Sequence, residues 1–197
     1  MTRKIRSGFL SITCLLANIS AMAVEQPTLS ETVQPFIRVQ SPTLVLTHVR
    51  VIDGTGKPAV ADQNVTLDHG KIVRIEPATP VTASPETSVL DLTGYSVMPG
   101  IVGLYNDLYY QTLPNVQPGF GDQREIELLV EAGFTPVEAI RIATLNGATY
   151  AGRQGTIGSI EVGKNADIQN TEIVFKDGVG YDSAKLLRSV AGRYGQY

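Results

Sequence analysis

The sequence predicts an α+β fold, in which a strand-rich unit is followed by helices and then by shorter strands. Residues 43–104 are dense in β-branched residues and are interrupted by Gly turns. Residues 122–147 carry two helix-start signals and apolar residues at helical spacing. Residues 155–180 return to short apolar runs between glycines. Blocks of strands and helices in this order are typical of α+β proteins.

The first strand-rich region divides into three parts. TLVLTHVRVID (43–53) predicts a strand that stops at the turn Gly54-Thr55-Gly56. NVTLDHGKIVRI (64–75) alternates on both sides of a glycine and predicts a hairpin. SVLDLTGYSVMPG (88–100) predicts two short strands around a Thr-Gly turn. In the last region, GTIGSIEVGKNADI (155–168) predicts short strands with Gly turns, and TEIVFKDGV is expected to form one further strand.

A helix before Gly133 and a helix at the carboxyl end are predicted from the signals at their ends. Asp122 and Glu125 form a capping-box pattern before an apolar run, and Gly133 is the residue expected after the helix end. At the carboxyl end, residues 183–190 are expected to form a terminal helix capped by Asp182.

The central helix has the clearest start signal in the chain. Thr135 and Glu138 form a second capping box, with Pro136 at the first helical position. An apolar stripe follows, and the helix is expected to end near Asn146-Gly147.

The amino end has the layout of a secretory signal peptide. Residues 8–20 are mostly apolar and Ala21-Met22-Ala23 is an A-x-A cleavage site; the preceding basic residues are Arg3, Lys4 and Arg6. We expect residues 1–23 to be removed and the chain to be exported to the periplasm or the extracellular space. No membrane span is expected after that cleavage.

Composition excludes several functions for the rest of the chain. Removal of the three basic residues of the signal leaves 13 Lys and Arg against 19 Asp and Glu, a net charge of −6. This acidic balance argues against nucleic acid and anionic membranes as partners. Cys14, the single cysteine, lies within the signal, so neither disulfides nor a thiolate nucleophile are expected. Residues 24–42 are polar and Pro-punctuated, which predicts a linker.

Six segments, in this order, resemble the amidohydrolase superfamily, in particular its exported imidazolonepropionase-like and dipeptidase-like members. They are HVRVIDGTG (48–56), GKIVRI (70–75), LDLTGYSVMPGIVGLYNDLYY (90–110), EAGFTPVEAIRIATLNGATYAG (131–152), GTIGSIEVGKNADI (155–168) and NTEIVFKDGVGYD (170–182). The resemblance implies a composite β-sandwich of the metal-dependent hydrolase type and, inserted in it, a TIM (β/α)8 barrel. It also implies a divalent metal, usually zinc, and hydrolysis of carbon–nitrogen bonds other than ordinary peptide bonds, or of dipeptides.

The resemblance also divides the chain. Residues 43–98 correspond to the amino-terminal part of the sandwich and 153–181 to its carboxy-terminal part. Residues 99–152 correspond to the first strand and last helices of the barrel, and 182–197 to a terminal helical segment.

Three departures from the family pattern lie in the barrel region and just after it. The first barrel strand of the family ends in His-x-His, whose side chains share one face of the strand, and Tyr105 and Asp107 occupy those positions. Gly133 follows Pro99 by only 34 residues, whereas a complete barrel needs about 250. A smaller deletion is expected after Asp167. The sequence therefore predicts an incomplete barrel.

The remaining candidate residues offer little chemistry. Asp107 is the one residue that we consider as a metal contact, and it lacks the partners that a catalytic metal needs. His48 and His69 are expected to be structural or solvent-facing, and the tyrosines after Gly103 are expected to pack together. No catalytic residue, cofactor-binding residue or bound cofactor is expected.

We interpret the chain as an amidohydrolase-related protein without the hydrolase activity. The alternatives are a non-catalytic binding or assembly module, or an unstable remnant of a decayed gene. Self-association or docking on a full-length relative is the interaction expected. The strand-rich unit is expected to be stable, whereas residues 101–146 are expected to be poorly packed because the sheet that they would cover is missing.

Overall fold

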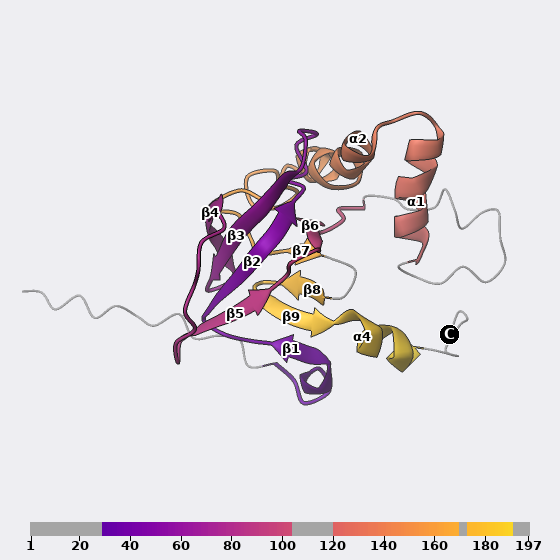
Figure 1. Cartoon of the computed structure of the whole chain (residues 1–197). Coiled ribbons are helices and arrows are strands. Elements are labelled where there is room, and N and C mark those ends of the chain that lie inside the picture. Colours follow the sequence, from indigo (N-terminus) through magenta and orange to yellow (C-terminus); the bar gives the residue numbers. More distant parts are fainter. Residues whose placement is uncertain (1–28, 104–119, 170–172, 191–197) are drawn as a thin grey trace, which may run out of the picture.

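The structure is a computed structural model that describes residues 29–103, 120–169 and 173–190 (Figure 1). The elements in chain order are η1 (Gln34–Phe36), β1 (Ile37–Val39), β2 (Thr43–Val51), β3 (Val60–Asp68), β4 (Lys71–Pro77), β5 (Thr87–Asp91), β6 (Ser96–Pro99), α1 (Phe120–Glu131), α2 (Pro136–Arg141), the π-helical segment η2 (Ile142–Asn146), α3 (Gly147–Tyr150), β7 (Ile168–Gln169), β8 (Ile173–Lys176), β9 (Val179–Asp182) and α4 (Ser183–Val190).

The strands form one mixed sheet of nine strands in which β2 is the central element. The hydrogen-bonded order is β1-β9-β8-β7-β6-β2-β3-β4, and β5 also pairs with β2. Along one side of β2, residues 43–47 pair with β5 and residues 50–51 pair with β6, both in parallel. The other pairings are antiparallel. The expected strands at 43–53 and 88–100 are confirmed.

Strands from the two ends of the chain share one hydrophobic core. Leu44 and Leu46 of β2 are buried in the same cluster as Ile173 and Phe175 of β8. The other large buried members are Val49, Val65, Leu67, Ile72, Val97, Ile160 and Ile168. Because burial of apolar surface is the main favourable term in folding, these two regions of the sequence depend on each other for stability.

Two hairpin turns, one from each strand-rich region, are in direct contact. The expected β3–β4 hairpin is confirmed, and its turn residues His69 and Gly70 have φ of 45° and 76°. Asp177 and Gly178 have the same conformation, with φ of 49° and 78°. A Cβ on Gly70 would lie 2.9 Å from the Asp177 carbonyl oxygen, so the approach of the two turns requires glycine.

The Asp177-Gly178 turn corrects the expectation of a single strand after residue 170. β8 and β9 are two antiparallel strands, in which Lys176 pairs with Val179. Both turn residues have positive φ, as a two-residue hairpin of right-handed twist requires, and Asp-Gly is a preferred sequence for it.

The expected short strands between residues 155 and 166 are wrong. This part of the described chain consists of turns, and its one ladder contact is an isolated bridge between Lys71 and Asn165. Its backbone groups bond to other elements instead: the Ile160 N–H donates to the Asp53 carbonyl at 3.0 Å. Gly158 and Gly163 have φ of 89° and 93°, outside the range of strands.

The expected linker also contains structure. Within residues 24–42, η1 is a 3₁₀ turn, and β1 pairs with β9 through Ile37 and Tyr181. A strand of three residues between Pro35 and Ser41-Pro42 is too short for a strand prediction, so this edge strand was missed. The terminal helix α4 follows β9 directly, and the Asp182 carboxylate accepts the Lys185 N–H at 2.9 Å, which confirms the predicted cap.

Helix α1 begins earlier than predicted. Because α1 starts at Phe120, Asp122 lies in its first turn and does not cap it. The predicted end is confirmed: Gly133 has φ of 107°, its N–H donates to Val130, and the Phe134 N–H donates to Leu129. These two bonds are those of a Schellman motif.

The second capping box is confirmed in full. The Thr135 side chain accepts the Glu138 N–H, and the Glu138 carboxylate accepts the Thr135 N–H at 2.8 Å. The helix does not end near Asn146-Gly147, however, but continues through η2 and α3 to Tyr150.

Candidate functional site

The region where the first barrel strand was expected is closed by a direct contact with the helices. Residues 101–103 follow β6 but are not a strand, which corrects the expected strand from Ile101. The Val102 N–H donates to the Ala143 carbonyl at 2.9 Å. On the neighbouring turn, a Cβ on Gly147 would lie 2.1 Å from the Val102 carbonyl oxygen. The helix backbone therefore packs against the chain that leaves the sheet.

Buried side chains support this contact. Ala139, Thr144 and Ala148 have no exposed surface, and Ile140 is buried as well. Thr144 donates its hydroxyl to the Ile140 carbonyl at 2.8 Å, so its polar group is satisfied within the helix. The segment α2–α3 is thus packed against the chain that leaves β6, contrary to the expectation of poor packing up to residue 146.

The positions that correspond to the family's His-x-His lie outside the described residues. Tyr105 and Asp107 fall in the interval 104–119, as do Tyr109 and Tyr110. The proposed metal contact of Asp107 and the packing of the tyrosines therefore remain predictions from the sequence.

Each of the two histidines has one carboxylate neighbour at the surface. His48 lies at an irregularity between β2 and β3, with Nδ1 2.8 Å from Asp62 Oδ1. Both residues have positive φ, 54° and 52°. His69 Nδ1 lies 3.1 Å from Asp68 Oδ2. The pKa of Asp68 is lowered, first by a hydrogen bond from Thr43 and then by His69.

The described residues do not bring together a metal-binding set. Across residues 29–103, 120–169 and 173–190, no group of three or more His, Cys, Asp or Glu side chains is placed to hold a metal ion. A hydrolytic divalent metal uses at least three protein ligands. The side chains in these three ranges therefore do not supply such a centre by themselves.

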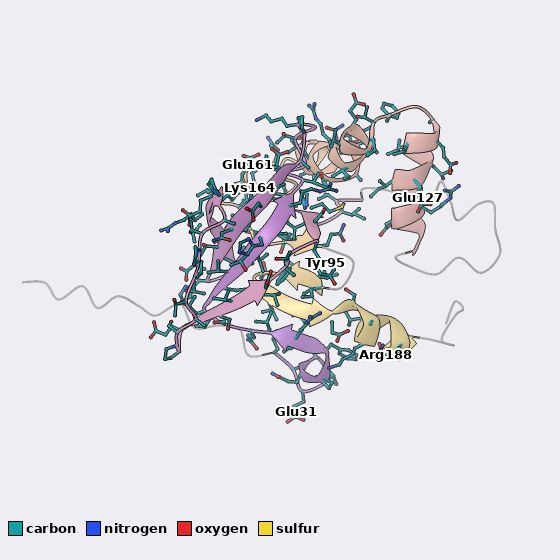
Figure 2. The ribbon with its side chains drawn as sticks, viewed as in Figure 1. Glu31, Tyr95, Glu127, Glu161, Lys164 and Arg188 are labelled. Atoms are coloured by element: carbon teal, nitrogen blue, oxygen red, sulfur yellow. The ribbon has the colours of Figure 1, made fainter. Side chains whose placement is uncertain are left out.

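A buried lysine cluster was missed by the sequence analysis. Lys164 is only 8% exposed, and its Nζ donates to the hydroxyl of the buried Ser159. That hydroxyl donates to Glu161 Oε1 at 2.8 Å, and Lys164 Nζ lies 3.5 Å from the same oxygen. Lys164 and Glu161 are labelled in Figure 2. The sequence offered one signal for this cluster, which is the position of Lys164 between a turn glycine, Gly163, and the apolar Ala166.

The lysine cluster has a structural explanation. A serine and a lysine in contact can form a nucleophile and base pair, but here the ammonium group is paired with a carboxylate and donates to the serine. The backbone of the same segment is bound to β4, because the Ile72 N–H donates to the Lys164 carbonyl at 2.9 Å and Gly163 donates to Ile72 at 2.7 Å. The cluster therefore holds residues 159–164 against the sheet.

Of the described helices, none has the length and apolar character that crossing a membrane requires.

Comparison with known proteins agrees with the resemblance found in the sequence. The model of the amidohydrolase family matches residues 121–183. Imidazolonepropionase from Alkaliphilus metalliredigens is 28% identical over 134 residues, which cover 61% of this chain and 32% of that protein. These matches support membership of the amidohydrolase superfamily. It spans about a third of the length of the curated relative that it matches.

One solved structure shows the same fold over most of the chain. A provisionally named prolidase from Bifidobacterium longum superposes with a TM-score of 0.54 at 12% identity. The match covers 70% of this chain and 94% of the other. Nearly all of that solved chain therefore corresponds to residues of this chain.

Proposed function

We propose that this chain is an amidohydrolase-related protein that keeps the superfamily's composite β-sandwich and lacks its hydrolysis of carbon–nitrogen bonds. The contact of Val102 with Ala143 and Gly147 is the observation that carries the proposal. In a complete barrel of about 250 residues, many strands and helices separate the first strand from the last helix. Here a helix backbone packs directly on the chain that leaves β6, and α1 begins 21 residues after Pro99.

The donor set does not fit a catalytic metal. By resemblance, the first two ligands would be at Tyr105 and Asp107, and only the second is a usual ligand of zinc. The other ligands of the family lie on later barrel strands, for which the chain has no room between Pro99 and the helices. We therefore derive no catalytic step through a metal.

Metal content and turnover, measured together, test this proposal. We expect the purified chain to bind zinc or manganese far below one ion per chain and to leave dipeptides and N-acyl amino acids intact. The double variant Tyr105→His with Asp107→His should stay inactive, because two ligands do not complete the shell. One metal per chain, with turnover that a chelator abolishes, would refute the proposal.

We also propose that the chain is exported, on the basis of the signal-peptide layout of residues 1–23. The secreted form should begin at Val24. Intact mass of the protein recovered outside the cytoplasm tests this, and a mass that includes residues 1–23 would count against it.

A second candidate function is that of a non-catalytic assembly module. The observation that favours it is α1, which packs against α2 and stands away from the sheet in Figure 1. Its outer face exposes Leu128, at 37%. Apolar residues on an exposed helix face are a common feature of docking surfaces.

A further inference from the structure

The exposed face of α1 is acidic. Arg124, Glu127, Leu128 and Glu131 follow one another at the spacing of a single helix face. Ile126 and Leu129, which are less exposed than Glu127, Leu128 and Glu131, lie on the opposite side. The acidic face is therefore a surface separate from the one that packs in the fold.

One arginine on this face serves two carboxylates. Nη1 of Arg124 lies 2.8 Å from Glu131 Oε1 and 2.8 Å from Glu127 Oε2. Glu131, followed by Glu127, raises the pKa of Arg124 above its usual range. The last turn of α1 has no basic residue, and the carboxyl end of a helix is itself negative. The face thus keeps an excess of negative charge at that end.

The exposed face of α4 is basic. Lys185 and Arg188 are exposed neighbours at a spacing of three residues, and Leu186 is 36% exposed. The pKa of Asp182, at the start of this helix, is lowered first by the Lys185 N–H and then by Lys185, Arg188 and Arg38. Within α4 the two charged side chains, Lys185 and Arg188, are both basic.

We propose that the acidic face of α1 docks on the basic face of α4 of a second copy of this chain. The two faces have complementary charge, with Glu127 and Glu131 on α1 against Lys185 and Arg188 on α4. Both project from the same side of the sheet in Figure 1, and Figure 2 labels Glu127 on one and Arg188 on the other. A two-fold axis between them would place α1 against the second copy's α4 and α4 against its α1. Such an isologous pair is closed and buries both faces at once.

This inference goes beyond the proposed loss of hydrolysis. Dimerisation and the loss of hydrolysis rest on different residues, so either proposal can be refuted while the other holds. Analytical ultracentrifugation of the purified full-length secreted chain tests it. We expect a monomer–dimer equilibrium that weakens as salt is added, because exposed ion pairs are screened. Reversal of the acidic face (Glu127→Lys with Glu131→Lys) should weaken dimerisation at least about tenfold. Reversal of the basic face (Lys185→Glu with Arg188→Glu) should have the same effect.

Mixing the two reversed chains separates docking from misfolding. One copy then carries a basic α1 and a normal α4, and the other carries a normal α1 and an acidic α4. The mixed dimer has complementary charges at both contacts, so mixing should restore dimerisation. The exposed pair on β4 provides the matched control, in which Arg74→Glu with Glu76→Lys should leave the equilibrium unchanged. A chain that stays monomeric, or dimers that mixing does not restore, would overturn the proposal.

Discussion

Gly147 is the residue on which the contact between the sheet and the helices most depends. A methyl group there would overlap the Val102 carbonyl oxygen, since the Cβ position is 2.1 Å away. Gly147→Ala should therefore lower the free energy of unfolding by about 1–3 kcal/mol, although alanine favours helix elsewhere. Denaturant unfolding measures the change.

Gly155 provides the control for that substitution. It has no atom within 4 Å of its Cβ position, and its φ lies outside the left-handed range. Gly155→Ala should change stability by no more than about 0.5 kcal/mol. Equal effects of the two substitutions would mean that the close approach to Val102 does not exist.

Lys164 should matter for stability although it lies in no active site. Lys164→Met keeps an unbranched side chain, one atom shorter, but removes the donor to the Ser159 hydroxyl. We expect a loss of about 1–3 kcal/mol because the buried hydroxyl loses a hydrogen bond from a charged group. The exposed Lys57 is the matched site, where Lys57→Met should be nearly neutral. Thermal or denaturant unfolding of both variants measures the difference. Equal midpoints would contradict a stabilising role for the lysine cluster.

The sequence predicts single-residue features well when their cause is local. The capping pair Thr135 and Glu138, and the cap at Asp182, are three residues or fewer from the groups that they bind. The Asp177-Gly178 turn was equally local and could have been found from its two residues. The need for glycine at 147 was not readable, because it comes from Val102, which is 45 residues earlier.

At the level of the element, the start of α2 depends on its capping box. Thr135 Oγ1 donates to Glu138 Oε2 at 2.6 Å, and this bond, followed by the one from the Thr135 N–H, lowers the pKa of Glu138. Thr135→Ala should reduce stability by about 1 kcal/mol at neutral pH. Thr149→Ala, in the same helical segment but away from its start, should stay within about 0.5 kcal/mol of the parent chain.

The loss at Thr135 should depend on pH. A carboxyl whose pKa is lowered by folding stabilises the fold above its ordinary pKa, here near 4.5, and loses that effect as pH falls through the lower folded value. The difference between the parent chain and Thr135→Ala should therefore shrink as pH falls below about 4.5. Denaturant midpoints across acidic pH measure it, and a difference that is independent of pH would rule out the Glu138 contribution.

Elements were predicted where their signals lie within the element itself. The hairpin of β3 and β4 has alternation and a turn glycine, and it was found. Residues 155–166 have similar glycines and apolar residues, but their backbone makes separate hydrogen bonds to Asp53 and to Ile72 of β4 and forms no continuous ladder. The continuation of the helix past Asn146 passes through a π-helical segment, for which the sequence has no simple signal.

The whole molecule is held by a core to which both ends of the chain contribute. Ile173 and Phe175 are buried together with Leu44 and Leu46, and this core argues against an unstable remnant. The expected weakness of residues 101–146 now applies to α1, because α2–α3 has buried residues and a backbone bond to Val102.

Hydrogen exchange at Val102 tests most directly whether the helices close the sheet without a barrel. The account predicts slow exchange of the Val102 amide and of the amides from Ala139 to Ala148, similar to the core strand β2. The amides of α1 should exchange faster, because α1 packs on α2 and exposes Glu127, Leu128 and Glu131 on its outer face. Exchange of Val102 and of Ala139 to Ala148 as fast as that of α1, while β2 stays protected, would contradict the account.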